Sequence, residues 1–213
     1  MDFVAIDFET ANEKRTSACS IGIVGVKNGI MIEKQHYLFK PIPDYFTNTW
    51  IHGIDEDTVE NESTFFDKWK EIKHHFETNL VIAHNAAFDI SVLRNVMMES
   101  GLQFPNLTYL CTYRMSQKVL PQLSNHKLST LANHFNLKLN HHQALSDAEV
   151  CAQIALNLMK LEKCNDLMEL SKSLGFRLGK LKLDNEYDSF SIKKVRKSFY
   201  SYKNNEEINI EVK

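Results

Sequence analysis

Two carboxylates near the start of the chain, Asp7 and Glu9, are the first side chains whose spacing could do chemistry. They end an apolar segment, residues 2–8, that is typical of a buried strand. Side chains two apart on a strand leave the same face, so both carboxylates point one way. A cation would relieve their repulsion, and oxygen ligands select a hard ion such as Mg²⁺ or Mn²⁺. The pair alone predicts either a metal site or a strand that runs out into solvent.

A second polar group follows the short apolar segment 80–83, which we predict to be a strand. His84 and Asn85 precede Phe88 and Asp89, and Asp89 falls where the strand gives way to a helix. An acid in a first helical turn is favourable because of the backbone dipole. Asp89 is therefore either a capping acid or part of the same site as the first pair.

A third group, His141, His142 and Asp147, surrounds the start of another predicted helix, residues 146–161. Ser146 is a suitable N-cap for this helix. On a continuous helix His142 and Asp147 would lie on different faces, whereas a loop-to-helix junction lets both converge on one site. The alternative is a surface pair of histidines before a helix.

An acid pair after an apolar strand also occurs in haloacid-dehalogenase-type phosphatases, in the pattern Asp-x-Asp-x-Thr. Asp7, Glu9 and Thr10 match it imperfectly, because the second acid is Glu and the threonine comes one place early. The second and third polar groups have no counterpart in that short pattern. The choice between the two classes therefore depends on all three groups together.

The three groups together resemble, in order and spacing, the signature of the DEDDh 3′–5′ exonucleases: Asp7-x-Glu9, Asn85-x-x-Phe88-Asp89 and His142-x-x-x-x-Asp147. The stretch 84–89 is very similar to that of the family's proofreading subunits of bacterial DNA polymerase III, and segment 50–54 resembles a family loop motif. The family pattern His-x-Ala-x-x-Asp fits His142 and not His141. The resemblance covers about residues 1–162 and outweighs the phosphatase interpretation.

The resemblance implies a role for each residue of the signature. The implied ligands of two Mg²⁺ or Mn²⁺ ions are the carboxylates Asp7, Glu9, Asp89 and Asp147. His142 would be the general base, since a histidine pKa near 6.5 suits that role at neutral pH. The residues expected to hold the 3′-terminal nucleotide are Thr10, His52, Ile54, Asn85 and Phe88.

The implied activity is 3′–5′ exonuclease action on single-stranded or frayed DNA ends, of proofreading or repair type, either free-standing or with a DNA polymerase as partner. Exoribonucleases and oligoribonucleases share the five signature residues, so RNA is the alternative substrate. A non-catalytic, polymerase-associated nucleic-acid-binding protein would be expected if a ligand carboxylate were missing. None is missing from this sequence.

Apolar patterning predicts the elements that position these groups. Strands are expected at 2–8, 21–26, 30–39, 80–83 and 107–110, with a hairpin turn at Asn28-Gly29. Helices are expected at 63–76, 89–98, 127–135, 146–161 and 166–174. An early hairpin followed by alternating helices and strands indicates a mixed sheet covered by helices. This agrees with the α/β, ribonuclease-H-like fold that the resemblance implies, a five-stranded mixed sheet flanked by helices.

Charged residues are distributed unequally along the 213 residues, although the net formal charge is only −2. Residues 1–162 hold 14 Lys and Arg against 19 Asp and Glu, whereas residues 163–213 hold 11 against 8. An acidic body is unlike a protein that binds nucleic acid through bulk charge. We predict an exonuclease domain at 1–162, followed at 163–213 by a helix and a basic, aromatic extension. Its segment 189–203 would either track a phosphate backbone or fold onto the body.

The sequence carries three indications of where in the cell the protein works. No apolar run approaches the roughly 20 residues needed to span a bilayer, so we expect no membrane span. The first residues carry an acid where a signal peptide needs a basic segment. Four cysteines without CxxC spacing favour a reducing compartment, and we expect a cytoplasmic protein.

Overall fold

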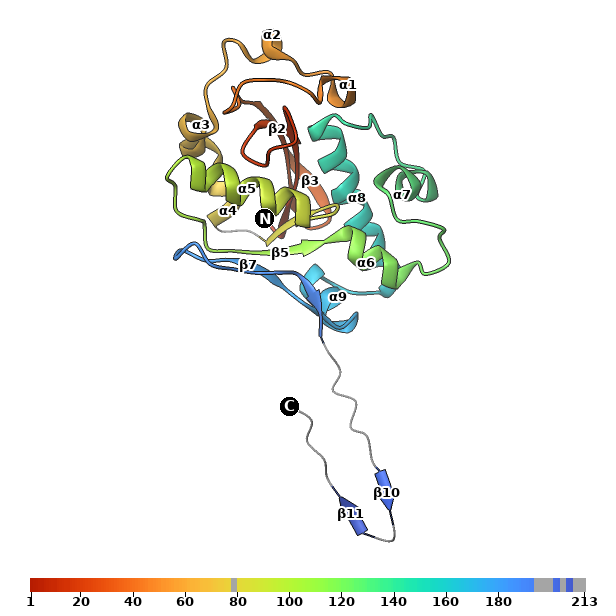
Figure 1. The fold of residues 1–213 in the computed structure, drawn as a ribbon. Helices are drawn as coiled ribbons and strands as arrows, with labels where there is room; N and C mark the ends of the chain where they lie inside the picture. Colours follow the sequence, from red (N-terminus) through yellow and green to blue (C-terminus); the bar gives the residue numbers. More distant parts are fainter. Residues whose placement is uncertain (78–79, 194–200, 204–205, 209–213) are drawn as a thin grey trace.

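A mixed sheet runs through the computed structural model, which describes residues 1–77, 80–193, 201–203 and 206–208 (Figure 1). Its strands are β1 (Phe3–Thr10), β2 (Ala18–Lys27), β3 (Ile30–Leu38), β4 (Leu80–Ala83), β5 (Leu107–Cys111), β7 (Gly179–Leu181) and β8 (Tyr187–Asp188). They lie in the order β3-β2-β1-β4-β5-β7-β8. The predicted α/β fold, a mixed sheet with helices against it, is confirmed.

The sheet combines an antiparallel hairpin with parallel strand pairs. The β2–β3 hairpin turns at Asn28 and Gly29, whose φ angles of 53° and 73° are the left-handed values that a two-residue type I′ turn requires. β1 pairs antiparallel with β2 and parallel with β4, and β4 pairs parallel with β5. Because the carboxyl ends of β1 and β4 share one edge, the first two polar groups of the sequence meet there.

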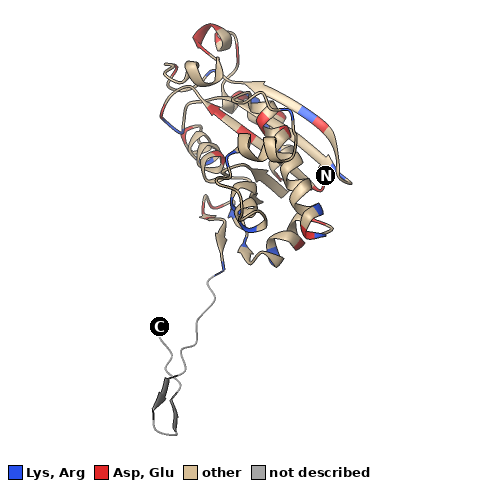
Figure 2. Cartoon of the chain, turned by 90° about the vertical axis from the view of Figure 1, so that its right-hand side faces the viewer, with Lys and Arg blue, Asp and Glu red and all other residues tan. Residues whose placement is uncertain are grey.

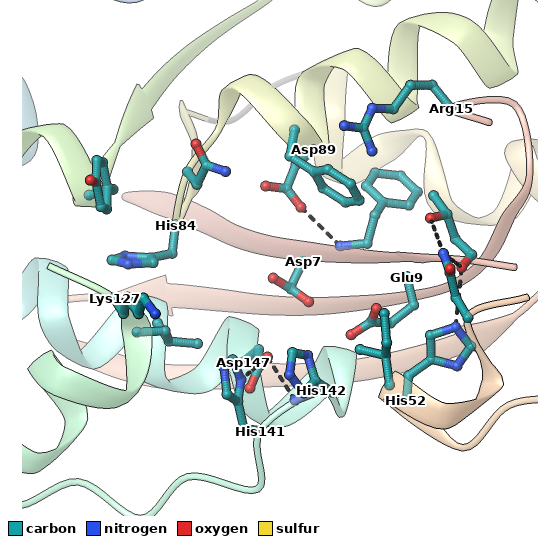
Figure 3. Close-up of a pocket in the computed structure, with 18 of the residues that line it drawn as sticks. Asp7, Glu9, Arg15, His52, His84, Asp89, Lys127, His141, His142 and Asp147 are labelled. Atoms are coloured by element: carbon teal, nitrogen blue, oxygen red, sulfur yellow. Dashed lines mark hydrogen bonds and ion pairs between the residues drawn. The ribbon is translucent and has the colours of Figure 1, made fainter. Parts of the chain in front are cut away.

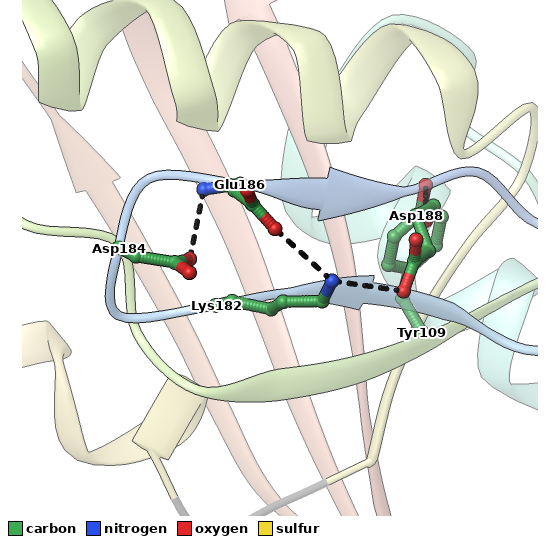
Figure 4. Close-up of polar contacts among 5 residues, drawn as sticks. All are labelled: Tyr109, Lys182, Asp184, Glu186 and Asp188. Carbon is green, nitrogen blue, oxygen red and sulfur yellow. Dashed lines mark hydrogen bonds and ion pairs between the residues drawn. The ribbon is translucent and has the colours of Figure 1, made fainter.

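The sheet has seven strands, so the predicted number of five is wrong. The additional pair is the β7–β8 hairpin, which extends the sheet beyond β5. Lys182 bridges this hairpin through ion pairs of 3.4 Å to Glu186 and to Asp188, and the Tyr109 hydroxyl donates to the Asp188 carbonyl (Figure 4). Strands of three and two residues are too short to show an alternating pattern, so the sequence contains no strand signal there.

Helices cover both faces of the sheet and enclose two apolar cores. On one face lie α3 (Phe65–Ile72), α4 (His74–Glu77) and α5 (Ala87–Glu99). On the other lie α6 (Thr112–Val119), α7 (Leu128–His134), α8 (Ala144–Glu162) and α9 (Leu167–Ser173). Alternate residues of β1 enter each core, and Asp7 and Glu9 continue the series that faces α8.

Several helix boundaries differ from the prediction for identifiable reasons. The helix expected at 63–76 is divided at Lys73 into α3 and α4. α6 begins directly after β5 and was not predicted. α8 begins at Ala144, so Ser146 is not its N-cap. The Ser146 hydroxyl instead accepts a hydrogen bond from the backbone N–H of Asn140.

Two short helices, α1 (Thr49–His52) and α2 (Glu56–Val59), lie in the connection from β3 to α3. α1 ends at Gly53, whose φ of 77° is the left-handed conformation that commonly ends a helix. This connection brings His52 back to the end of β1, where its ring nitrogen lies 3.1 Å from the Thr10 carbonyl.

The segment after residue 162 packs on the rest of the chain through α9 and the hairpins that follow it. Leu167 and Leu170 are buried in one core and Leu181 in the other. The remaining short strands are β6 (Phe176–Arg177), β9 (Ser191–Ile192), β10 (Ser201–Lys203) and β11 (Glu206–Ile208). Residues 194–200 of the basic, aromatic segment predicted at 189–203 lie outside the described residues. No helix in the described part of the chain is long and apolar enough to cross a membrane.

Candidate active site

The carboxyl end of β1 carries Asp7 and Glu9 on the face that α8 covers. α8 approaches closely because β2 presents Gly22, and a Cβ there would clash with the backbone of Ala144. Asp147 lies in the first turn of α8, so this packing carries it to β1. One oxygen atom from each of Asp7, Glu9 and Asp147 lies within 4.8 Å of the other two.

Asp89 reaches the same place from α5, on the opposite face of the sheet. Its Oδ1 accepts a hydrogen bond of 3.0 Å from the backbone N–H of Phe8, which fixes the carboxylate beside β1. Asp7 lies between Asp89 and Asp147 in Figure 3. The structure therefore brings together all four carboxylates that the motif spacing selected.

Electrostatic repulsion and burial both disfavour four ionised carboxyl groups in this space. Burial, and then the charges of Asp89, Asp147 and Glu9, hold the pKa of Asp7 well above its usual range. Burial, and then the charges of Asp147 and Asp89, raise the pKa of Glu9 to about 8, and burial raises that of Asp89 to about 7. The pKa of Asp147 is also raised by burial, against the opposing effect of His141. A positive charge placed among these groups would reverse the penalty.

The donor set fits a divalent cation. Among the described residues, Oδ1 of Asp147 is buried and has no hydrogen-bond partner. Its Oδ2 is hydrogen-bonded to the ring of His141 and to the backbone N–H of His142, each at 3.1 Å. One oxygen is thus held in place while the other is left for a ligand. Carboxylate oxygens in this number are the ligands that hard divalent ions prefer.

The paired histidines both line the cavity, in different ways. Their rings stack at 3.9 Å with an angle of 13° between the planes. The ring of His141 bonds to Asp147, whereas His142 bonds to it only through its backbone and has a positive φ of 65°. Burial, and then His141, lower the pKa of His142, which favours the neutral imidazole that a base requires. The choice of His142 over His141 stays a prediction.

Four of the five residues expected to hold a nucleotide line the cavity. Thr10, His52, Asn85 and Phe88 line it, but Ile54 does not. The backbone N–H of Ile54 instead donates to Nδ1 of His52, while Nε2 of His52 donates to the Thr10 carbonyl. Both ring nitrogens are therefore engaged within the protein, and His52 offers a substrate its ring face.

These groups surround an open cavity of about 620 Å³, large enough for a nucleotide. A family model described as exonuclease, of RNase T type, matches residues 4–155 of this chain. The chain belongs to the exonuclease family. The family prediction made from the three motifs is thereby confirmed, and we call this cavity the exonuclease cleft.

Relatives of the exonuclease domain occur within much larger proteins. The chain is 31% identical over 170 residues to DNA polymerase III PolC-type of Caldanaerobacter subterraneus subsp. tengcongensis, covering 78% of this chain and 12% of that protein. It is also 31% identical over 172 residues to the 3′-5′ exonuclease DinG of Bacillus subtilis, covering 78% of this chain and 18% of DinG. The chain thus spans less than a fifth of the length of these relatives.

Solved structures share the fold at lower identity. One is exonuclease X in complex with 5′ overhanging duplex DNA, with a TM-score of 0.65 and 22% identity, covering 81% of this chain and 99% of that one. Another is a 3′-exonuclease that recognises the histone mRNA stem-loop, with a TM-score of 0.69 and 16% identity, covering 90% of both chains. At these identities the likeness shows the fold.

The exonuclease cleft also contains residues that sequence reasoning did not select. Arg15 lies with its Cζ 4.1 Å from the centre of the Phe88 ring, and its charge opposes the rise in the pKa of Asp89. Ile51 and Lys127 line the cleft as well. A single arginine or lysine in a polar loop has no spacing to distinguish it, so only the fold reveals these positions.

His84 is held as a neutral, structural residue of the cleft. Its Nδ1 lies 3.0 Å from the Thr112 hydroxyl and its Nε2 2.9 Å from the His126 carbonyl. Burial lowers its pKa to about 4, so it is uncharged near neutral pH. With both nitrogens bonded, His84 positions the loop that carries Asn85 and is unsuited to proton transfer.

Proposed function

We propose that this chain is a 3′–5′ exonuclease that removes nucleotides from single-stranded or frayed DNA ends, with two Mg²⁺ or Mn²⁺ ions bound by its carboxylates. The observation that carries the proposal is the convergence of Asp7, Glu9 and Asp147 within 4.8 Å, with a buried oxygen of Asp147 left unpartnered among the described residues. Asp89, fixed by the backbone of Phe8, supplies the fourth carboxylate.

Phosphodiester hydrolysis needs charge neutralisation and an activated water. When bound, a pair of divalent ions supplies positive charge for the phosphate oxygens and makes water acidic enough to lose a proton near neutral pH. Asp7 lies between Asp89 and Asp147 (Figure 3). In this proposal Asp7, Glu9 and Asp147 would hold the ions together, and Asp89 would supply a further carboxylate.

His142 is the proposed general base. Its ring lines the cleft and its lowered pKa keeps it neutral, so it can accept the proton of the attacking water. His141 has a different role in this proposal, because its ring is hydrogen-bonded to Asp147. It orients that carboxylate, so we regard it as a positioning residue.

The 3′-terminal nucleotide is expected between Phe88 and the ring face of His52, with Thr10 and Asn85 beside it. Stacking on rings tolerates every base, which suits an exonuclease without sequence preference. Along the ribbon in the view of Figure 2, Lys and Arg lie interspersed with Asp and Glu. We therefore assign the recognition of phosphate to the cleft and its ions.

DNA is the proposed substrate because relatives at 31% identity are named as a DNA polymerase and a 3′-5′ exonuclease. A DNA polymerase is the corresponding proposed partner, and a free-standing enzyme is the alternative arrangement. Pull-down of a polymerase from the source cell by the inactive Asp7→Asn variant would support the first arrangement.

The test of this function is a degradation time course in Mn²⁺ on three 5′-labelled substrates: single-stranded DNA, a duplex with a mismatched 3′ end, and a short RNA. We expect ladders that shorten one nucleotide at a time on both DNA substrates, with slower loss of the RNA. Faster degradation of the RNA would assign the chain to exoribonucleases. Internal cuts without a ladder would contradict exonuclease action.

A further inference from the structure

A second cavity, of about 390 Å³, lies beside the exonuclease cleft, between the first turns of α5, the end of β5 and the β8 segment. We call it the arginine groove. The residues that define it are Arg94, Tyr109, Tyr113, Arg114, Tyr187 and Phe190. Asn85 and Tyr113 line both cavities, so the groove and the cleft adjoin.

The charge of the arginine groove is opposite to that of the cleft. Its lining includes two arginines and no acid, whereas five acids line the cleft. Within residues 1–77 and 80–193, neither Arg94 nor Arg114 forms an ion pair with an acid. Two uncompensated guanidinium groups in an acid-free cavity suit an anion, and planar N–H donors match phosphate oxygens.

Arg94 is half-buried and packs against an aromatic ring of the groove. Its Cζ lies 3.4 Å from the centre of the Tyr187 ring, and its Nε is buried without a hydrogen-bond partner among the described residues. A buried, unpaired donor on a charged group is costly unless a ligand satisfies it. Arg114 is exposed at the rim, on α6.

Aromatic rings complete the recognition surface. Tyr187 stacks on Arg94 yet remains 45% exposed, and Tyr113 is fixed edge-on against His84 and His126 at 5.7 and 6.3 Å. Cations interleaved with half-exposed rings are the composition of surfaces that bind single-stranded nucleic acid, because phosphates meet the cations and bases stack on the rings.

The position of the groove fits the direction of a bound strand. In Figure 3 the four carboxylates lie between two ends of the cleft, with Arg15 and His52 at one end and His84 and Lys127 at the other. The proposed 3′-terminal nucleotide occupies the His52 end. A strand that leaves by the other end passes His84, whose ring lies 5.7 Å from that of Tyr113, a residue that lines both cavities.

We propose that the arginine groove binds the substrate strand on the 5′ side of the scissile phosphate, with backbone phosphates at Arg94 and Arg114 and a base on Tyr187. This inference rests on the proposed function and extends it. It predicts that the enzyme distinguishes a strand several nucleotides long from a minimal substrate that occupies only the cleft.

The test compares two substrates in Mn²⁺. One is a 5′-labelled oligothymidylate of about twelve nucleotides, and the other is the 4-nitrophenyl ester of thymidine 5′-monophosphate, which is too short to reach the groove. The variants are Arg114→Gln, Arg94→Gln and the two combined. Lys118→Gln is the matched control, because Lys118 is exposed on the same helix as Arg114 but does not line the groove.

For the combined variant we expect KM for the oligonucleotide to rise about tenfold at nearly constant kcat, with the ester unaffected. The slope of log kcat/KM against log salt should become shallower by about 0.7 for each phosphate that the variant no longer neutralises. Arg114→Gln alone should show part of the effect, since removing an exposed side chain leaves the fold intact.

Equal effects on both substrates, or no effect on either while Arg94→Gln lowers only Tm, would show that the arginines merely hold the β7–β8 hairpin and would overturn the inference. Wild-type protein that hydrolyses neither substrate would instead refute the proposed function, and the inference with it. If Lys118→Gln had the same effect as Arg114→Gln, the effect would come from overall positive charge and not from the groove. That result would also overturn the inference.

Discussion

At the scale of single residues, Glu9 and Asp147 show why the cleft needs a cation. Both carboxyl groups are partly removed from water and face other acids, and burial is the largest cause of the rise in each pKa. When no ion is bound, the folded protein must either keep these carboxyl groups protonated or tolerate the repulsion between their charges. The free energy that this costs becomes available for cation binding when the ion arrives.

Replacing Glu9 by Gln should stabilise the metal-free protein, and more so at higher pH. The pKa of Glu9 is about 8 in the fold against an ordinary 4.5, so its contribution to stability is complete below pH 4.5 and is lost as the pH rises through 8. The difference in Tm between Glu9→Gln and wild type, measured in EDTA, should therefore widen from pH 5 to pH 8, reaching roughly 5 °C or more.

Comparing the two proteins at each pH cancels the titration of histidines, which both contain. Excess Mn²⁺ should raise the Tm of wild type well above that of the variant and so reverse the order. A constant difference across this range would show that Glu9 is ionised normally in the fold.

The two adjacent histidines should differ in their effect on catalysis. His142→Ala should lower kcat by about 10²–10⁴-fold, the usual contribution of a general base. His141→Ala removes only a hydrogen bond that orients Asp147 and should cost about tenfold or less. Steady-state rates on single-stranded DNA check both values. Equal losses would mean that the motif register selects the wrong histidine.

The pH profile of kcat is an independent test of the same residue. Since only neutral imidazole accepts a proton and the pKa of His142 is lowered from its usual value near 6.5, the rate should rise with pH and level off below neutrality. A rate that falls as the pH rises from 5 to 7 would exclude a histidine base.

The resemblance in motif order and spacing selected four carboxylates that the structure brings together, two at the end of β1, one in α5 after β4 and one in the first turn of α8. It did not separate Ile51, which lines the cleft, from Ile54, which contributes a backbone N–H to His52. Which side chain of a short helix faces a cavity depends on how that helix is docked. The pattern of residues does not contain that information.

At the scale of elements, the contact between β2 and α8 decides where Asp147 lies. Gly22→Ala would place a methyl group against the backbone of Ala144, which cannot move aside as a side chain can. We expect a loss of about 3 kcal/mol in the free energy of unfolding, and a loss of activity because α8 shifts. Thermal unfolding and nuclease assays of the variant measure both.

Gly25→Ala is the matched control on the same strand. The Cβ there would meet the end of the flexible Met1 side chain, which can rotate away. Its effect on stability should be about 1 kcal/mol or less. If the two variants lose stability equally, close packing of α8 on Gly22 does not position the site.

Elements with a repeated pattern or a specific turn were predictable, and those that depend on docking were not. The hairpin at Asn28-Gly29 follows from backbone conformations that these residues adopt readily. The first turn of α8 was missed because Ser146 resembles an N-cap, yet its hydroxyl accepts from Asn140 in the preceding loop. A residue of the N-cap type indicates that the chain turns nearby. The surrounding contacts decide which backbone N–H donates a hydrogen bond to its side chain.

At the scale of the molecule, the division at residue 162 can be tested directly. The segment beyond it contributes Leu167, Leu170, Phe176 and Leu181 to the two cores, each at most 3% exposed. Losing one such side chain typically costs about 2–5 kcal/mol, and a whole domain is stable by only about 5–15 kcal/mol. A chain of residues 1–162 should therefore show no cooperative thermal transition.

A chain that ends after Lys193 is the appropriate comparison, because it retains the packing of α9 and of the β7–β8 hairpin. We expect it to unfold cooperatively with a Tm near that of the full chain. If residues 1–162 alone unfold cooperatively at that temperature, the predicted domain boundary is correct and the later segment is an appendage.

Phosphodiester hydrolysis by this protein should depend on divalent cations held by the converging carboxylates. The most direct test of this dependence is the hydrolysis of 5′-labelled single-stranded DNA by EDTA-treated protein as Mg²⁺ or Mn²⁺ is added back, with wild type and Asp147→Asn compared. We predict no hydrolysis in EDTA, a ladder shortening from the 3′ end once the ion is restored, and no ladder from the folded Asp147→Asn variant. Undiminished hydrolysis in EDTA, or wild-type rates from Asp147→Asn, would contradict it.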